Sequence, residues 1–120
     1  MSDPALNQTL FGIHGAALEL RAQRVGLLTS NIANASTPGY KARDLDFGAA
    51  LKAEMAGADS ATAGANHIRY RLPVMPSLDG NTVDMGSEQV AFAENAVGYA
   101  TTLQFLTQRV DTVTRAIKGE

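Results

Sequence analysis

The hydroxyl and imidazole side chains are the first candidates for chemistry in this sequence. Ser30, Ser36 and Thr37 lie close together in the stretch "SNIANASTPGY", and the two histidines are His14 and His67. A serine or threonine nucleophile needs a neighbouring base that takes its proton. No residue near these hydroxyls in the sequence is suited to that role. We therefore predict no catalytic residue and expect that the protein is not an enzyme.

The sequence patterns of metal and phosphate sites are also missing. Neither histidine has a cysteine, histidine or carboxylate at a zinc-ligand spacing, and the chain has no cysteine. The stretch "DGNTVDMGSE" has only a faint likeness to a calcium loop, because its sixth position is Asp84 instead of the required glycine. No glycine-rich phosphate-binding motif occurs. We expect no metal site and no cofactor.

The composition favours a small helical protein. The chain has 120 residues, enough for one domain, residues 1–120. Hydrophobic residues make up 45% of the chain but aromatic residues only 6%, so the apolar content is mostly Ala, Leu and Val. The net charge of -2 gives no attraction to nucleic acid. No apolar run approaches transmembrane length, and the N-terminal residues lack the features of a cleaved signal peptide. We expect no nucleic-acid partner and no membrane insertion.

The first long helix is predicted over residues 3–36. Asp3 is a good N-cap and Pro4 a good first residue, since the missing N–H of proline would be unpaired there. Small residues such as Gly26 are predicted to let neighbouring backbones approach closely. Two apolar rows follow on nearly opposite sides of the helix. The rows are Phe11, Leu18, Val25 and Ile32, and Ile13, Leu20 and Leu27. One partner helix cannot cover both rows, so we interpret the surplus as an assembly surface.

The second long helix is predicted over residues 87–118. Ser87 is its expected N-cap, and Glu88 suits the positive charge of the first turn. Apolar residues recur at alternating spacings of four and three, which is the heptad pattern of a coiled coil. This predicted seam consists of Phe92, Ala96, Tyr99, Leu103, Leu106, Val110, Val113 and Ile117. It belongs either to a core against the first helix or to contacts with other subunits.

The joint after the first helix is the stretch "TPGY", residues 37–40. Pro38 disfavours helical geometry at the preceding residue, so the helix should end near Ala35. Pro and Gly occupy the second and third places of a type II turn, where Gly accepts a positive φ. The amides of Asn31 and Asn34 are predicted to bond the last helical carbonyls, the backbone of a neighbouring subunit, or both.

The segment between the long helices, residues 37–86, is predicted to be small and irregular. Asp46 should cap a short helix, and a loop should follow over residues 58–66. Residues 67–74 alternate apolar and polar side chains, which predicts an edge strand or a single extended segment. A turn is expected at Asp79–Gly80. The predicted fold class is therefore mainly α, with long N- and C-terminal helices packed as an antiparallel coiled coil around a short helix and a possible β segment.

Two long stretches near the ends of the chain carry a resemblance to a known family. The first is "LLTSNIANASTPGYKARDLDF", residues 27–47, and the second is "GNTVDMGSEQVAFAENAVGYATTLQFLTQRVDTVTRAI", residues 80–117. Together they resemble the axial proteins of the bacterial flagellum, which build its rod, hook and hook-filament junction. The parts "KARDLDF" and "ENAVGY" favour a proximal rod protein, and the related rod protein FlgC is the nearest alternative.

The resemblance implies a structural role in motility. Members of this family are expected to be exported unfolded through the flagellar type III apparatus, without a cleaved signal peptide, and to polymerise helically in the periplasm. The proximal rod would link the export gate and MS ring to the distal rod and transmit torque. The implied partners are further copies of the chain, FliE and rod proteins such as FlgC. A small coiled-coil export chaperone or binding module is the alternative from another class.

The same resemblance implies which residues of the motif matter. It marks family-motif positions and subunit contacts at Asn31, Asn34, Thr37, Pro38, Gly39, Tyr40, Arg43, Asp46 and Phe47.

Overall fold

The computed structural model describes residues 12–73 and 75–119 of the chain. Their elements are α2 (Gly12–Ala33), β1 (Arg43–Leu45), α3 (Phe47–Met55), α4 (Ser60–Ala65), β2 (Ile68–Tyr70) and α5 (Met85–Lys118). The molecule is elongated, with extents of 64 × 25 × 20 Å. The mainly α fold with two long helices is confirmed. The expected N-cap Asp3, its neighbour Pro4 and the apolar Phe11 lie outside the described residues.

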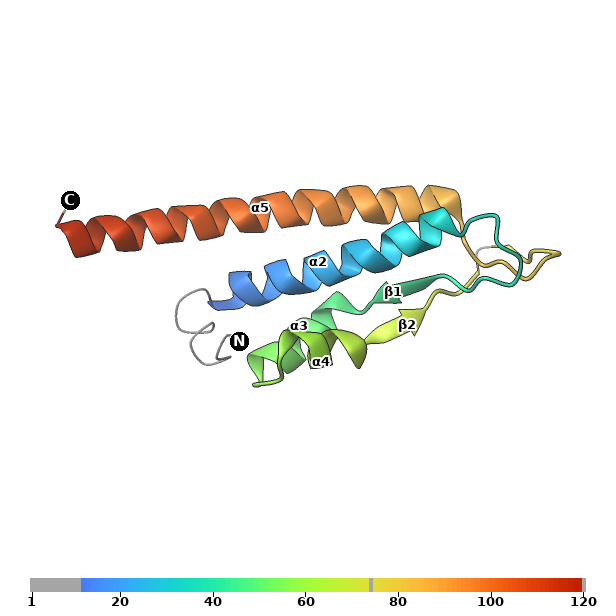
Figure 1. The fold of residues 1–120 in the computed structure, drawn as a ribbon, viewed down its shortest axis with the longest axis horizontal. Coiled ribbons are helices and arrows are strands. Elements are labelled where there is room, and N and C mark those ends of the chain that lie inside the picture. Colours follow the sequence, from blue (N-terminus) through green and yellow to red (C-terminus); the bar gives the residue numbers. More distant parts are fainter. Residues whose placement is uncertain (1–11, 74, 120) are drawn as a thin grey trace.

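The two long helices run antiparallel, and the small middle packs on the other side of α2 (Figure 1). The prediction of Ser87 as the N-cap of the second long helix was wrong, because α5 begins at Met85 with Asp84 as its N-cap. Asp84 keeps an extended conformation, and its backbone carbonyl accepts the first helical hydrogen bond from the Glu88 N–H at 2.9 Å. The Ser87 hydroxyl donates to the Asp84 carboxylate instead of capping a backbone N–H.

The short helix of the middle has the predicted cap. The Asp46 carboxylate accepts a hydrogen bond from the Ala49 N–H at 3.2 Å, which starts α3. The predicted loop over residues 58–66 was wrong, because most of it forms α4. Asp59 caps α4 by accepting from the Thr62 N–H at 2.7 Å, and the alanines of this stretch favour a helix once it is capped.

The predicted β segment is confirmed, but it is shorter than residues 67–74. It forms β2, which pairs antiparallel with β1 in the register Arg43↔Tyr70, Asp44↔Arg69 and Leu45↔Ile68. Its partner β1 lies within the stretch "KARDLDF", which carries no strand signal of its own. Only the packing of the middle against α2 brings these two short segments together.

The hydrophobic core lies between α2 and the middle. Leu20, Leu45 and Ala50 are buried there, and Leu27, Phe47, Leu51 and Ile68 pack against them. The second apolar row of α2 therefore faces α3 and β1. Our interpretation of this surplus row as an assembly surface was wrong for Leu20 and Leu27, because the chain's own middle covers them. The predicted close approach at Gly26 was also wrong, since no other atom lies within 4 Å of a Cβ built there.

Candidate assembly site

Asn31, near the end of α2, completes the hydrogen bonding of β1. Its side-chain Nδ2 donates to the Arg43 carbonyl at 2.7 Å, and its Oδ1 accepts from the Arg43 N–H at 3.1 Å. In the register of the sheet, the backbone groups of Arg43 point away from β2. The amide of Asn31 thus takes the place of a third strand at this edge. It fixes the sheet against the helix pair.

The remaining hydrogen-bonding positions of the Asn31 amide are also occupied. Nδ2 donates to Glu88 Oε2 at 2.9 Å, and the Tyr40 hydroxyl donates to Oδ1 at 3.1 Å. Ser30 Oγ lies 2.9 Å from the same hydroxyl. Asn31 is fully buried, so in this conformation its amide bonds within the chain and is not available to another subunit.

A chain of ion pairs joins α2, the sheet and the start of α5. Arg24 contacts Asp44 through two hydrogen bonds of 2.8 and 2.9 Å. Arg71 reaches the same carboxylate at 2.9 Å and Glu88 Oε1 at 2.9 Å. The hydrogen bond from Arg24 to Asp44 raises the pKa of Arg24, against the opposing effect of burial. We call Arg24, Asp44, Arg71 and Glu88, together with Asn31, the joint cluster.

The turn after α2 has the predicted geometry. Gly39 has a φ of 75°, and the Tyr40 N–H donates to the Thr37 carbonyl at 3.2 Å, as a type II turn requires. The Asn81 amide donates to the Asn34 and Thr37 carbonyls at 2.9 and 2.8 Å. The end of α2 is therefore capped by a side chain from a segment more than forty residues away in the sequence.

The predicted motif residues divide between two environments. Thr37, Pro38 and Gly39 are exposed on the turn, and Asp46 is exposed at its cap position. Phe47 is half-buried, with the Arg21 guanidinium carbon 4.3 Å from the centre of its ring. The exposed turn remains predicted as a subunit contact. For Arg43, Asn34 and Tyr40 the structure gives half-buried positions at the joint.

The sequence did not identify most of the joint cluster. Arg24, Asp44, Arg71 and Glu88 come from four different elements or their ends, and no spacing pattern links them. The Arg71–Glu88 pair combines the residue after β2 with the first turn of α5. Arg71 fits a polar position of an alternating strand, and Glu88 fits the acidic preference of a first helical turn. Because each residue has such a local explanation, nothing in the sequence indicated that the two form a pair.

The predicted coiled-coil seam does not lie against α2. The residues of α5 that are buried are Glu88, Ala91, Asn95, Thr102 and Leu106. Of the predicted seam, only Leu106 is buried and Tyr99 is half-buried. The alternative of an internal core formed by the whole seam was therefore wrong. The exposed members, which we call the outer row, are Phe92, Ala96, Leu103, Val110, Val113 and Ile117.

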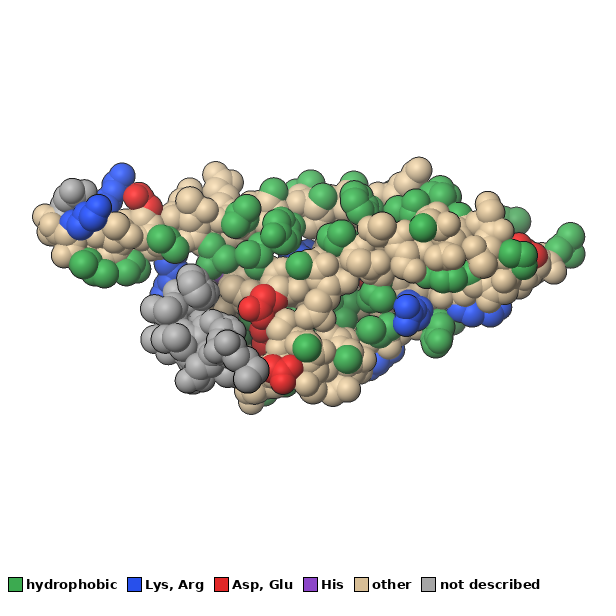
Figure 2. Space-filling view, in the orientation of Figure 1, with side chains coloured by type: hydrophobic (Ala, Val, Ile, Leu, Met, Phe, Trp, Pro, Cys, Tyr) green, Lys and Arg blue, Asp and Glu red, His purple; other side chains and the backbone are tan. Residues whose placement is uncertain are grey.

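Hydrophobic side chains gather along much of the visible face of α5 (Figure 2). The exposed fraction is 40% for Phe92, 51% for Val110 and 82% for Ile117. At about 100° per residue, the first part of the outer row lies about 80° around the helix from the buried residues. It therefore continues the α2–α5 contact outward and offers an open apolar edge.

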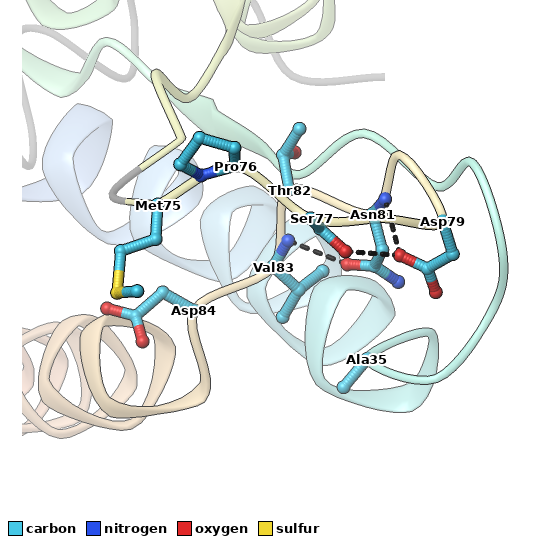
Figure 3. A pocket seen from close by; sticks show the side chains of 9 residues that line it. All are labelled: Ala35, Met75, Pro76, Ser77, Asp79, Asn81, Thr82, Val83 and Asp84. Carbon is cyan, nitrogen blue, oxygen red and sulfur yellow. Dashed lines mark hydrogen bonds between the residues drawn. The ribbon is translucent and has the colours of Figure 1, made fainter.

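Among the described residues, the cavity beside the loop before α5 holds no arrangement of catalytic groups. It has a volume of about 310 Å³. Its polar atoms bond one another, because Asp79 accepts from the Ser77 hydroxyl and the Asn81 N–H, and Asn81 accepts from the Val83 N–H (Figure 3). Within the described part of the chain, no three metal-ligating side chains gather, and no helix is long and apolar enough to cross a membrane.

Comparison of the sequence with known proteins identifies a family that this chain resembles. A family model for the flagella basal body rod protein matches residues 12–41, which cover α2 and the turn. FlgB of Cereibacter sphaeroides (strain ATCC 17029 / ATH 2.4.9) is 50% identical over 91% of this chain and 94% of its own length. FlgB of Aeromonas hydrophila is 41% identical over 92% and 93%, and FlgB of Escherichia coli K12 is 43% identical over 78% and 82%.

These relatives bear the name FlgB, which decides against the alternative of FlgC. Their matches cover between 78% and 92% of this chain. The chain belongs to the FlgB family of flagellar basal body rod proteins, and it is a structural component that assembles with other rod proteins in the basal body.

Proposed function

We propose that this chain is a subunit of the proximal rod that polymerises helically with further copies of itself. In this role it links the export gate and MS ring to the distal rod and transmits torque. FliE and FlgC are the proposed neighbours at its two ends. The subunit reaches the periplasm through the type III export apparatus without a cleaved signal peptide.

The outer row of α5 is the observation that carries this proposal. An apolar row that is half exposed along a long helix marks an assembly surface. The row is continuous with the α2–α5 contact, so a helix of a second copy can extend the same packing. A repeated contact of this kind between non-identical surfaces generates a helical filament when its rotation does not close a ring.

A charge in the outer row tests this assembly surface. We expect Leu103→Asp to abolish rod formation and motility while the purified monomer keeps its helical circular dichroism, because Leu103 is half exposed in the monomer and would be buried in the rod. The matched control is Thr101→Asp, a similar change at an exposed position on another side of the same helix. Electron microscopy of isolated basal bodies and swimming assays are the measurements.

The opposite result would contradict the proposal. Normal rods with Leu103→Asp would remove the outer row from the assembly surface. Leu106 is not suited to this test, because it is already buried in the monomer, and a charge there would unfold the helix pair before assembly was measured.

A further inference from the structure

The helix α5 buries a mostly polar row and leaves its more apolar row exposed. Among its buried residues, Glu88, Asn95 and Thr102 are polar, and only Leu106 is a large apolar residue. The outer row, whose first part lies about 80° away, contains Phe92 and several aliphatic residues. Burial of apolar surface alone would favour a rotation of α5 that brings the outer row against α2. Some other interaction must therefore hold the helix in the observed rotation.

Glu88 makes the strongest contacts that oppose this rotation. Its carboxylate is fully buried and lies 2.9 Å from Arg71 Nε and 2.9 Å from Asn31 Nδ2. The contact with Asn31 is a hydrogen bond and the contact with Arg71 is an ion pair, and both partners come from other elements. A rotation of α5 would carry the carboxylate away from both groups, which would leave the partly exposed Arg71 with Asp44 alone and the buried amide of Asn31 short of a partner.

Asn95 makes a second contact two turns further along α5. It is fully buried, and its Nδ2 donates to the Arg21 carbonyl of α2 at 3.0 Å. Its Oδ1 has no hydrogen-bond partner among the described residues. An alanine here would avoid that cost, so stability alone does not account for the asparagine. A buried asparagine between paired helices is a known means of fixing their register.

Gly98 completes the fit on the same side of α5. A Cβ at this position would lie 2.5 Å from Arg21 Cζ, so the missing side chain leaves room for the guanidinium of Arg21. The same guanidinium also lies over the ring of Phe47, the first residue of α3. The two long helices thus fit each other at Glu88, Asn95 and Gly98 when α5 has the observed rotation about its axis.

We propose that Glu88 and Asn95 are specificity-determining residues that pin the rotation of α5, so that the outer row stays exposed for a second copy of the chain. The inference rests on the proposed function, since it takes the outer row as the assembly surface. Removing the two side chains should let α5 rotate and bury its own outer row. The monomer would then lose the surface that a neighbouring copy needs.

The experiment uses a tryptophan at position 92 as a reporter, because the natural chain contains no tryptophan. In the full-length Phe92→Trp protein, a dilute monomer should show strong acrylamide quenching. Adding Glu88→Ala and Asn95→Ala should shift the emission to shorter wavelength and reduce the quenching, with the protein still monomeric by sedimentation velocity. The control adds Glu94→Ala and Gln104→Ala, two exposed positions of the same helix, and should leave the tryptophan exposed.

The outcomes distinguish the pinning role of Glu88 and Asn95 from the role of the outer row in assembly. A tryptophan that stays as exposed as in the control overturns the pinning role. If the tryptophan becomes protected and rods still form in cells with the Glu88→Ala/Asn95→Ala protein, pinning stands and the outer row is not the assembly surface. If the double variant loses its helical circular dichroism, the single variant Asn95→Ala with the same reporter is measured, and the same two criteria apply.

Discussion

A single amide, that of Asn31, connects the end of α2, the sheet and α5. It bonds both backbone groups of Arg43 and the carboxylate of Glu88 at distances of 2.7 to 3.1 Å. The motif around it, "NIANASTPGY", first suggested polar contacts between subunits. Its buried asparagine instead organises the subunit itself, whereas the exposed turn residues remain predicted subunit contacts.

Replacing Asn31 by aspartate tests this organising role. Asn31→Asp keeps the shape of the side chain but removes its donors and places a carboxylate beside Glu88. We expect a loss of about 3 kcal/mol in the free energy of unfolding, because a buried charge would lose its partner and face a like charge. Urea denaturation followed by circular dichroism measures it. The control Asn66→Asp makes the same change at an exposed position, and equal losses in both variants would contradict the assigned role.

Glu54 predicts a dependence of stability on pH. Its pKa is raised to about 7, first by burial and then by a hydrogen bond with Glu19 and by the charges of Glu19 and Asp59. Its pKa in the unfolded chain is about 4.5. Between these values the folded state binds more protons than the unfolded state. The contribution of Glu54 to stability is therefore fully present below pH 4.5 and is lost as the pH rises through 7.

The variant Glu54→Gln should remove this part of the pH dependence. The urea midpoint of the natural chain should fall between pH 5 and pH 8 more steeply than that of the variant. Glu94→Gln, at an exposed position of α5, is the matched control and should keep the natural slope. If the urea midpoint changes with pH equally in the natural chain and in Glu54→Gln, the pKa of Glu54 is not raised in the folded state.

At the scale of elements, β1 and β2 form an arm that is fixed to the helix pair through few contacts. The sheet has two strands of three residues each, which is too small to be stable alone. Arg71, at the end of β2, joins Asp44 of β1 to Glu88 of α5. The position of the arm therefore depends on charged contacts as well as on the core around Leu20.

We expect Arg71→Met to loosen the arm. The change leaves the Glu88 carboxylate buried with Asn31 as its remaining partner, at an expected cost of about 2–3 kcal/mol, less than for a fully buried pair because Arg71 is partly exposed. Hydrogen exchange of the β1 and β2 amides should become faster. Arg69→Met, in the same strand but exposed, is the control. Unchanged exchange in Arg71→Met would mean that apolar packing alone holds the arm.

At the scale of the whole molecule, the two long helices differ in length. α5 has 34 residues and α2 has 22 in the described part of the chain. Residues 107–119 of the C-terminal end are exposed throughout, and their helical part spans about 18 Å at 1.5 Å per residue. This end makes no buried contact among the described residues, so its order depends mostly on helix propensity.

Hydrogen exchange should therefore divide α5 into two parts. In a dilute monomer, we expect the amides of residues 107–118 to exchange faster than those of residues 88–106, which pack on α2 and the arm. In isolated rods both parts should be protected, because neighbouring copies would cover the outer row. Equal protection of both parts in the monomer would contradict the expectation that the C-terminal end is the less stable part of α5.

Local signals were enough to predict much of the fold. The turn at residues 37–40 follows from Pro38 and Gly39, and the start of α3 follows from Asp46, because these residues act on the backbone within a few positions. The two long helices follow from apolar periodicity. The resemblance of the two end stretches to flagellar axial proteins likewise needed no structure.

Only the tertiary structure decided which face of each long helix is buried. A heptad pattern predicts that α5 has an apolar side, but contacts of Glu88 and Asn95 with residues far away in the sequence set its rotation. The second row of α2 is likewise covered by a middle segment whose strand pairing has no local signal. The sequence by itself thus determined the two long helices, the turn after the first of them, the start of α3 and the family. Contacts between side chains far apart in the sequence decide the rotation of α5, the joint cluster and the exposure of the outer row. These features could therefore be read only from the tertiary structure.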